Sequence, residues 1–160
     1  FQQRLTAICT NSGVALVFVR ELTGAPVNGA TSWVSPKKAM IALSLRHKTN
    51  DIFWFSFFHE AAHILKHGRR EVFVDSGFDG SGSVAAEQEA DEFASDFLIP
   101  KHSLERFSSS GDKSAAAIEH FAKTLGVAPG IVVGRLQHDG LVPHSHLNGL
   151  KVRFDWSERE

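Results

Sequence analysis

The sequence predicts an α+β fold with a short, mostly antiparallel sheet, a histidine-bearing helix, a glutamate-bearing helix and a helical carboxyl-terminal part. Three observations predict this fold. Segments rich in β-branched residues alternate with turn residues before position 46. An apolar run at 52–58 leads into a segment with two histidines at helical spacing. After position 84, apolar residues repeat every three to four positions, which is typical of helices.

The elements before position 50 are marked by breaks between apolar segments. Gly13 ends a short polar helix, and the run Ser-Pro-Lys-Lys at 35–38 is a turn signal between two apolar segments. The run Val-Ala-Leu-Val-Phe-Val at 14–19 is typical of a buried strand. The expected elements are a helix at 2–9 and strands at 14–19, 30–34, 39–45 and, beyond the histidine-bearing helix, 71–74.

The histidine-bearing helix follows the apolar run at 52–58 and contains His-Glu-Ala-Ala-His at 59–63. His59 and His63 are one helical turn apart, so both imidazoles project from the same face and can bind one metal ion. Glu60 leaves the helix at a neighbouring angle, where its carboxylate can reach a water on that ion without ligating it. A metal ion that acidifies water beside a base is what metal-assisted hydrolysis needs.

The glutamate-bearing helix is predicted at 85–99 and is closed by Pro100. Glu87 and Asp91 are one turn apart and share a face. Two histidines, one carboxylate and a water make an open zinc site of the catalytic type, so Glu87 is the candidate third ligand. Asp91 is the candidate acceptor for the free ring N–H of a ligating histidine. Glu89 stays open as a rival ligand, and the whole acidic run also fits an ordinary solvated helix face.

Together these motifs resemble the ImmA/IrrE family of small zinc metallopeptidases, whose wider relatives are the gluzincins. The resemblance rests on His-Glu-x-x-His, on Glu-x-x-Ala-Asp-x-Phe-Ala and on a terminal Leu-Ile-Pro, and it is close over about 53–100. It implies a small zincin-like domain. Carried over by position, it implies His59, His63 and Glu87 as metal ligands, Glu60 as the general base and Asp91 as the acid that orients a histidine.

The resemblance also implies a function, which is zinc-dependent hydrolysis of peptide bonds in a protein substrate. The expected metal is Zn²⁺, although the same ligands suit Mn²⁺ or Fe²⁺. Because family members often lie beside helix-turn-helix regulators, the expected substrate is a transcriptional repressor or regulator encoded nearby. Two other functions stay open: a non-proteolytic, metal-binding regulatory protein of a toxin–antitoxin module, and a DNA-binding regulator that acts through the carboxyl-terminal helices.

Two parts of a peptidase are less well marked in this sequence. Zinc peptidases usually donate a hydrogen bond to the oxyanion from Tyr or His, and this chain has no Tyr. Arg135 and His144 are the candidate donors, because the chain's end can fold back over a cleft. The resemblance further implies that an extended substrate binds along an exposed edge strand, for which we expect the strand at 30–34 as the outermost one.

Composition limits the classes of protein to which the chain can belong. With 160 residues and 42% hydrophobic residues, it can bury an ordinary core. Its formal net charge of −1 gives no electrostatic reason to expect nucleic acid or an acidic membrane as the main partner. Cys9 is the sole cysteine, so no intrachain disulfide forms, which suits the cytoplasm. Because the chain starts at Phe1, we expect it to be part of a longer chain.

The carboxyl-terminal part is predicted to be a separate helical subdomain. We expect a catalytic core at 1–110 and a packing subdomain at 111–160, joined in one compact unit. Helices at 114–125 and 131–138, with a Gly-Val-Ala-Pro-Gly turn between them, match helix-turn-helix spacing. The second helix offers few cationic side chains for phosphate contacts, so packing is favoured over DNA binding.

Overall fold

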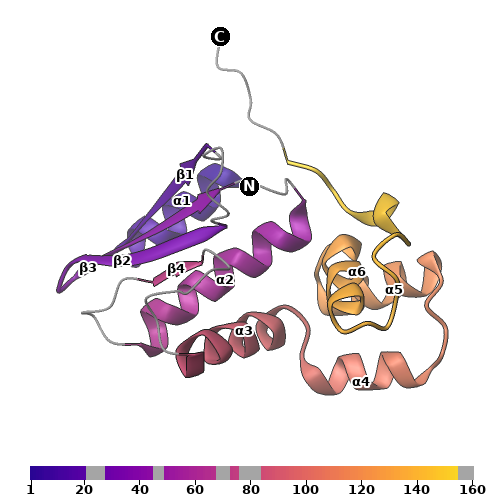
Figure 1. The fold of residues 1–160 in the computed structure, drawn as a ribbon. Helices are drawn as coiled ribbons and strands as arrows, with labels where there is room; N and C mark the ends of the chain where they lie inside the picture. The colour runs from indigo at the N-terminus through magenta and orange to yellow at the C-terminus, as the bar shows by residue number, and fades with distance from the viewer. Residues whose placement is uncertain (21–27, 45–48, 68–72, 76–83, 155–160) are drawn as a thin grey trace, which may run out of the picture. The chain divides into compact units, whose positions relative to one another are not determined.

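The computed structural model describes residues 1–20, 28–44, 49–67, 73–75 and 84–154. The chain divides into two compact units, of which unit 1 comprises Phe1–Arg46 and Ser56–Ala94. Unit 2 comprises His47–Phe55 and Ser95–Glu160. The predicted α+β class is confirmed, because the strands gather in unit 1 and unit 2 consists mainly of helices (Figure 1). The division into a core and a subdomain at residue 111 stays a prediction.

The sheet of unit 1 is mixed, with the strand order β1-β3-β2-β4 within the described residues. Strand β1 pairs in parallel with β3, whereas β2 pairs antiparallel with both β3 and β4, so antiparallel pairing predominates. The turn between β2 and β3 lies where the Ser-Pro-Lys-Lys signal predicts it. The bounds of the strands are β1 Val14–Val19, β2 Gly29–Ser35, β3 Lys38–Ser44 and β4 Phe73–Asp75.

The prediction that the strand at 30–34 lies outermost in the sheet is wrong. These residues belong to β2, which has β3 on one side and β4 on the other. The short strand β4 follows the histidine-bearing helix and pairs with residues 29–31 of β2. The alternation of residues in a strand shows which face is buried, but it carries no information about which strand lies beside it.

Helices flank this sheet and supply the rest of unit 1. Helix α1, Gln2–Asn11, packs beside β1. Helix α2, Asn50–Lys66, carries the two histidines, and its residues from Ser56 onward belong to unit 1. Helix α3, Val84–Leu98, buries three alanines that are four residues apart. These short side chains allow a close approach of α3 to its neighbours, which brings its acidic residues within reach of the α2 histidines.

The core of unit 1 forms where alternate strand residues face inward. Ala39, Ile41 and Leu43 of β3 are all buried, as the period of two in a strand requires. In α2, Ala62 is fully buried together with both motif histidines. The polar motif therefore lies in the core and not on a solvated helix face. Buried polar groups need hydrogen-bond or metal partners, so this location constrains what the histidines do.

Unit 2 is a group of short helices around an aliphatic core. Its buried core residues lie between Ile99 and Val142, and Phe107 and Phe121 stack with ring centroids 4.4 Å apart. Ser114 caps the amino end of α5, and Gly126 ends α5 in the left-handed conformation, with φ 71°. The helices are α4 Lys101–Ser109, α5 Ala115–Leu125, α6 Pro129–His138 and the short 3-10 helix η1 Asn148–Leu150. Helix α4 begins directly after Pro100 and is not among the helices predicted from the sequence.

The start of α2 is held within unit 2 by the chain's carboxyl-terminal part. Lys151 Nζ lies 2.6 Å from Asp51 Oδ2, and Asn50 Oδ1 accepts a hydrogen bond from the backbone N–H of Val152. Gly134 makes room for Asp51, since a Cβ at this position would lie 2.5 Å from Asp51 Oδ2. Asp51 is buried and Lys151 is partly buried, so their ion pair forms a specific anchor for this segment.

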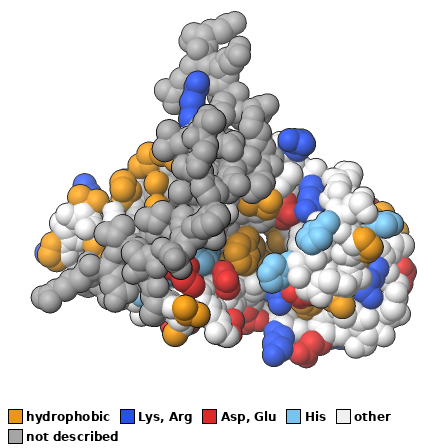
Figure 2. Space-filling view, viewed as in Figure 1, with side chains coloured by type: hydrophobic (Ala, Val, Ile, Leu, Met, Phe, Trp, Pro, Cys, Tyr) orange, Lys and Arg blue, Asp and Glu red, His pale blue; other side chains and the backbone are white. Residues whose placement is uncertain are grey.

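The helix-turn-helix segment of unit 2 has its second helix largely buried. Six of the ten residues of α6 are buried, and the polar Gln137 donates hydrogen bonds to the carbonyl of His146 and to Asn148 Oδ1. Arg135 pairs with Asp139, with Nε 2.8 Å from Oδ2. Figure 2 shows acidic, basic and histidine side chains mixed over the face of this unit. Arg135 and Gln137 of α6 are therefore engaged within the unit itself, and His138 Nδ1 lies 3.2 Å from Asp139 Oδ1.

One structural finding concerns membranes. Among the described residues, no single helix has the length and hydropathy needed to cross a bilayer, whereas α5 and α6 together, bent by 109°, pass that test by length and composition alone.

Candidate metal centre

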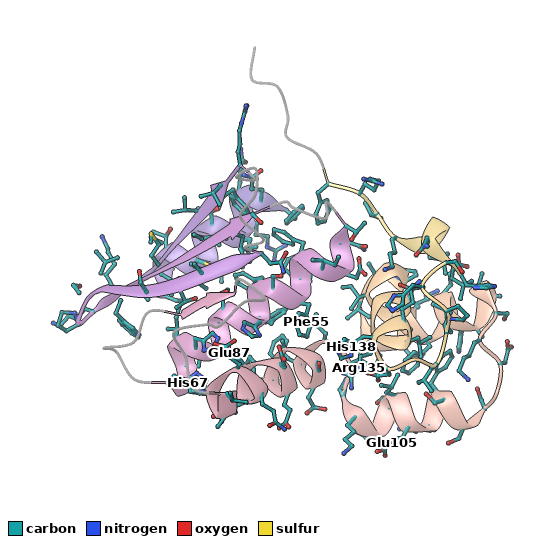
Figure 3. The ribbon with its side chains drawn as sticks, viewed as in Figure 1. Phe55, His67, Glu87, Glu105, Arg135 and His138 are labelled. Atoms are coloured by element: carbon teal, nitrogen blue, oxygen red, sulfur yellow. The ribbon has the colours of Figure 1, made fainter. Side chains whose placement is uncertain are left out.

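The candidate site is built on two helices of unit 1. His59 and His63 lie one turn apart on α2, and only 5% and 1% of their surfaces are exposed. Glu87 lies in the first turn of α3, where a carboxylate is also favoured by the helix dipole. Figure 3 labels Glu87 beside α2. The predicted one-turn spacing therefore brings both imidazoles to one place.

The donor atoms of these three residues converge. His63 Nε2 lies 3.1 Å from His59 Nε2, and His59 Nε2 lies 3.1 Å from Glu87 Oε2. The other oxygen of the same carboxylate, Glu87 Oε1, lies 3.6 Å from His63 Nε2. Ligands at zinc–nitrogen and zinc–oxygen distances in tetrahedral geometry lie about 3.4 Å apart. His59, His63 and Glu87 thus form a group that could hold a metal ion.

The second acidic residue of α3 contacts the outer nitrogen of His59. Asp91 Oδ1 lies 2.9 Å from His59 Nδ1, although 58% of the Asp91 side chain is exposed. If Nε2 of His59 faces a metal, its proton resides on Nδ1 and is donated to Asp91. Asp91 therefore lies where it can orient the ring of His59, and this orienting role stays a prediction.

Glu60 is enclosed by strand β2. Only 1% of its surface is exposed, and its Oε2 accepts a hydrogen bond of 2.5 Å from the Thr31 hydroxyl. Gly29 is needed for this arrangement, because a Cβ at position 29 would lie 2.5 Å from Glu60 Oε1. Sequence reasoning identified Glu60 but missed both β2 residues, since only the fold brings them together.

Burial favours the neutral form of His63. Its pKa is lowered to about 4, first because burial disfavours the charged imidazolium and then because His59 and His67 lie close by. A neutral imidazole is the form that binds metal. Near neutral pH, protons therefore compete only weakly with a metal for His63.

The lowered pKa of His63 predicts a pH-dependent stability of the metal-free protein. Between pH 4 and the ordinary value of 6.5, the unfolded state binds a proton at this residue that the folded state does not. Stability should therefore be greatest above that range and fall by up to about 3 kcal/mol as the pH decreases through it. Urea titrations in the presence of a chelator measure this slope. A His63→Gln variant should show a shallower slope, and an equally steep one would exclude His63 as the cause.

The two candidate oxyanion donors lie in unit 2. Arg135 is on α6 and pairs with Asp139, and His144 is exposed, with a backbone carbonyl that accepts a hydrogen bond from Asn148. Their role in stabilising an oxyanion stays a prediction.

Two further residues of unit 1, His67 and Glu89, lie next to the converging group. His67, directly after the end of α2, contacts His63 and Glu89. Glu89 is not part of the converging group, and instead contacts Lys66 and His67. The spacing of His63 and His67, again one turn, is the sequence signal that could have identified this contact.

The sequence matches the family described as Peptidase_M78, IrrE N-terminal-like domain, over residues 15–137. The chain belongs to this family. The matched segment includes α2 and α3 with the whole converging group. The family supports a metallopeptidase-like function for the domain. A comparison with curated proteins gave no significant match.

Proposed function

We propose that this IrrE-like protein is a zinc-dependent metalloendopeptidase that cleaves a protein substrate, namely a transcriptional repressor or regulator. The observation that carries the proposal is the convergence of donor atoms from His59, His63 and Glu87. The two imidazole Nε2 atoms lie 3.1 Å apart, Glu87 Oε2 lies 3.1 Å from that of His59, and Glu87 Oε1 lies 3.6 Å from that of His63. Three protein ligands leave a coordination position open for water or substrate, as catalytic zinc sites do. The membership of the family supports the same conclusion.

The residues around the proposed zinc ion have different roles in hydrolysis. A zinc ion held by this group would supply Lewis acidity, polarising the scissile carbonyl and bringing the pKa of water to about 7. Glu60 acts as the general base, which accepts the proton of the attacking water and passes it to the leaving amine. The Thr31 hydroxyl fixes one oxygen of Glu60, so that the carboxylate keeps one orientation during both transfers. Asp91 holds the ring of His59.

Co-incubation with the protein encoded beside this one tests the proposal. Purified protein is incubated with that candidate substrate in three arms: with zinc, with a chelator, and with zinc restored after chelation. Mass spectrometry should find defined fragments in the first and third arms only. Metal analysis of the same samples should find about one zinc ion per chain.

Two results would contradict the proposal. Fragments that persist in the chelator arm would show that cleavage does not depend on the metal. Stoichiometric zinc without fragments from any candidate substrate would favour a non-proteolytic, metal-binding regulatory protein.

A further inference from the structure

A chain of polar contacts extends from the outer nitrogen of His63 along the end of α2. His63 Nδ1 lies 2.9 Å from His67 Nδ1, and His67 Nε2 lies 3.2 Å from Glu89 Oε2. The other oxygen of Glu89 accepts a hydrogen bond of 2.9 Å from Lys66 Nζ. Figure 3 shows His67 at the carboxyl end of α2, beside the start of α3. The proposed function assigns no role to this chain of contacts.

The contacts fix where each proton lies once a metal is bound. A metal on His63 Nε2 leaves the ring proton on Nδ1, which is then a hydrogen-bond donor. His67 Nδ1 must accept that bond, so the proton of a neutral His67 resides on Nε2. That nitrogen faces Glu89, which as a carboxylate accepts hydrogen bonds. The contact between His63 and His67 and the contact between His67 and Glu89 then each have one donor and one acceptor.

The contact between His63 and His67 is more buried than an ordinary surface interaction. Only 10% of the His67 side chain is exposed, compared with 58% for Asp91, which contacts His59. Water therefore competes less for the outer nitrogen of His63 than for that of His59.

We propose that His67 is a positioning residue for the metal, which fixes the tautomer and ring orientation of His63, and that Glu89 in turn holds His67. This inference rests on the proposed metal site but not on proteolysis. Outer partners of a ligating histidine change metal affinity by about 10–100-fold when they are removed. His63 would then be held by His67, which directly follows α2, whereas His59 is held by an acid on α3.

A matched pair of substitutions at position 67 tests the proposal. His67→Phe keeps a ring but removes the acceptor, and we expect it to weaken zinc binding by about 10–100-fold. His67→Asn places an amide oxygen near the former Nδ1, and it should restore affinity to within a few-fold of wild type. Zinc affinity is measured by competition with a chromophoric chelator, and circular dichroism of the metal-free forms verifies that each variant folds.

Cobalt-substituted protein gives a second readout that does not depend on affinity. In wild type, the paramagnetically shifted spectrum should show two slowly exchanging ring N–H signals, one from His59 and one from His63. His67→Phe should lose the slow exchange of one signal only, and His67→Asn should keep both. Glu89→Ala, a change at a partly exposed position, should weaken zinc binding several-fold.

The outcomes separate this inference from the proposed function. Equal zinc affinity and equal N–H exchange in wild type and His67→Phe would overturn the positioning role, whether or not the protein cleaves a substrate. Equal losses in His67→Phe and His67→Asn would also overturn it, because the packing of the ring and not its acceptor would then matter. A wild-type protein that binds no zinc would overturn the metal site itself. Altered affinity without any cleavage would support the inference and contradict proteolysis.

Discussion

Replacing Glu60 with glutamine is expected to abolish peptide cleavage while the zinc content stays at the wild-type level. Glutamine has the same shape, and its amide oxygen can still accept the hydrogen bond from the Thr31 hydroxyl. The space next to Gly29 also accommodates it, because no atom is added. The substitution removes the carboxylate that takes a proton from water, and general-base catalysis of this kind contributes about 10²–10⁴-fold to the rate. Initial rates on the identified substrate measure the loss, and metal analysis verifies the zinc content.

A control for this substitution removes a carboxylate elsewhere. Glu105→Gln makes the same chemical change at an exposed position on α4, in unit 2, and should leave the rate unchanged. If Glu60→Gln cleaved the substrate as fast as Glu105→Gln, Glu60 would not be the base. A loss of zinc in Glu60→Gln would instead show that Glu60 affects the metal site and not the proton transfer.

The parts of the site that could be predicted from sequence are those fixed by a single helix. The spacing of His59 and His63 places both rings on one face of any helix, so their convergence needed no knowledge of the fold. Predicting Glu87 as a ligand required more information, because its position relative to α2 depends on how α2 and α3 pack. An open zinc site needs one further protein ligand besides the two histidines, and the family resemblance indicated Glu87 among the acidic residues of α3. The structure brings its carboxylate to the histidines.

The remaining parts depended on contacts between distant segments. Thr31 and Gly29 surround Glu60 only because β2 lies beside α2, and nothing in their local sequence indicates this. The position of β2 inside the sheet was missed for a similar reason, since β4 is short and lies beyond α2 in the sequence. Glu89 was interpreted as a solvated or rival residue because one-dimensional spacing cannot show that it meets His67.

Removing a ligand is expected to have the second large effect, a loss of zinc binding. Glu87→Gln keeps the size of the side chain but removes its negative charge and replaces one of its two oxygens, which lie 3.1 Å from His59 Nε2 and 3.6 Å from His63 Nε2. His63→Ala removes a buried donor outright. Each should weaken zinc binding by more than about 100-fold, beyond what the loss of an outer partner costs. Cleavage at limiting zinc should be lost in both, as measured by chelator competition and by rates.

The same helix offers a matched control for Glu87→Gln. Glu92→Gln makes the identical change five residues further along α3, at an exposed side chain that contacts Gln88 and lies outside the converging group. It should bind zinc as wild type does. Unchanged affinity in Glu87→Gln would show that this carboxylate is not a ligand. Because His59 and His63 alone cannot complete an open site with three protein ligands, another acid of α3 would then have to reach the metal, and the helix would have to rotate to bring it there.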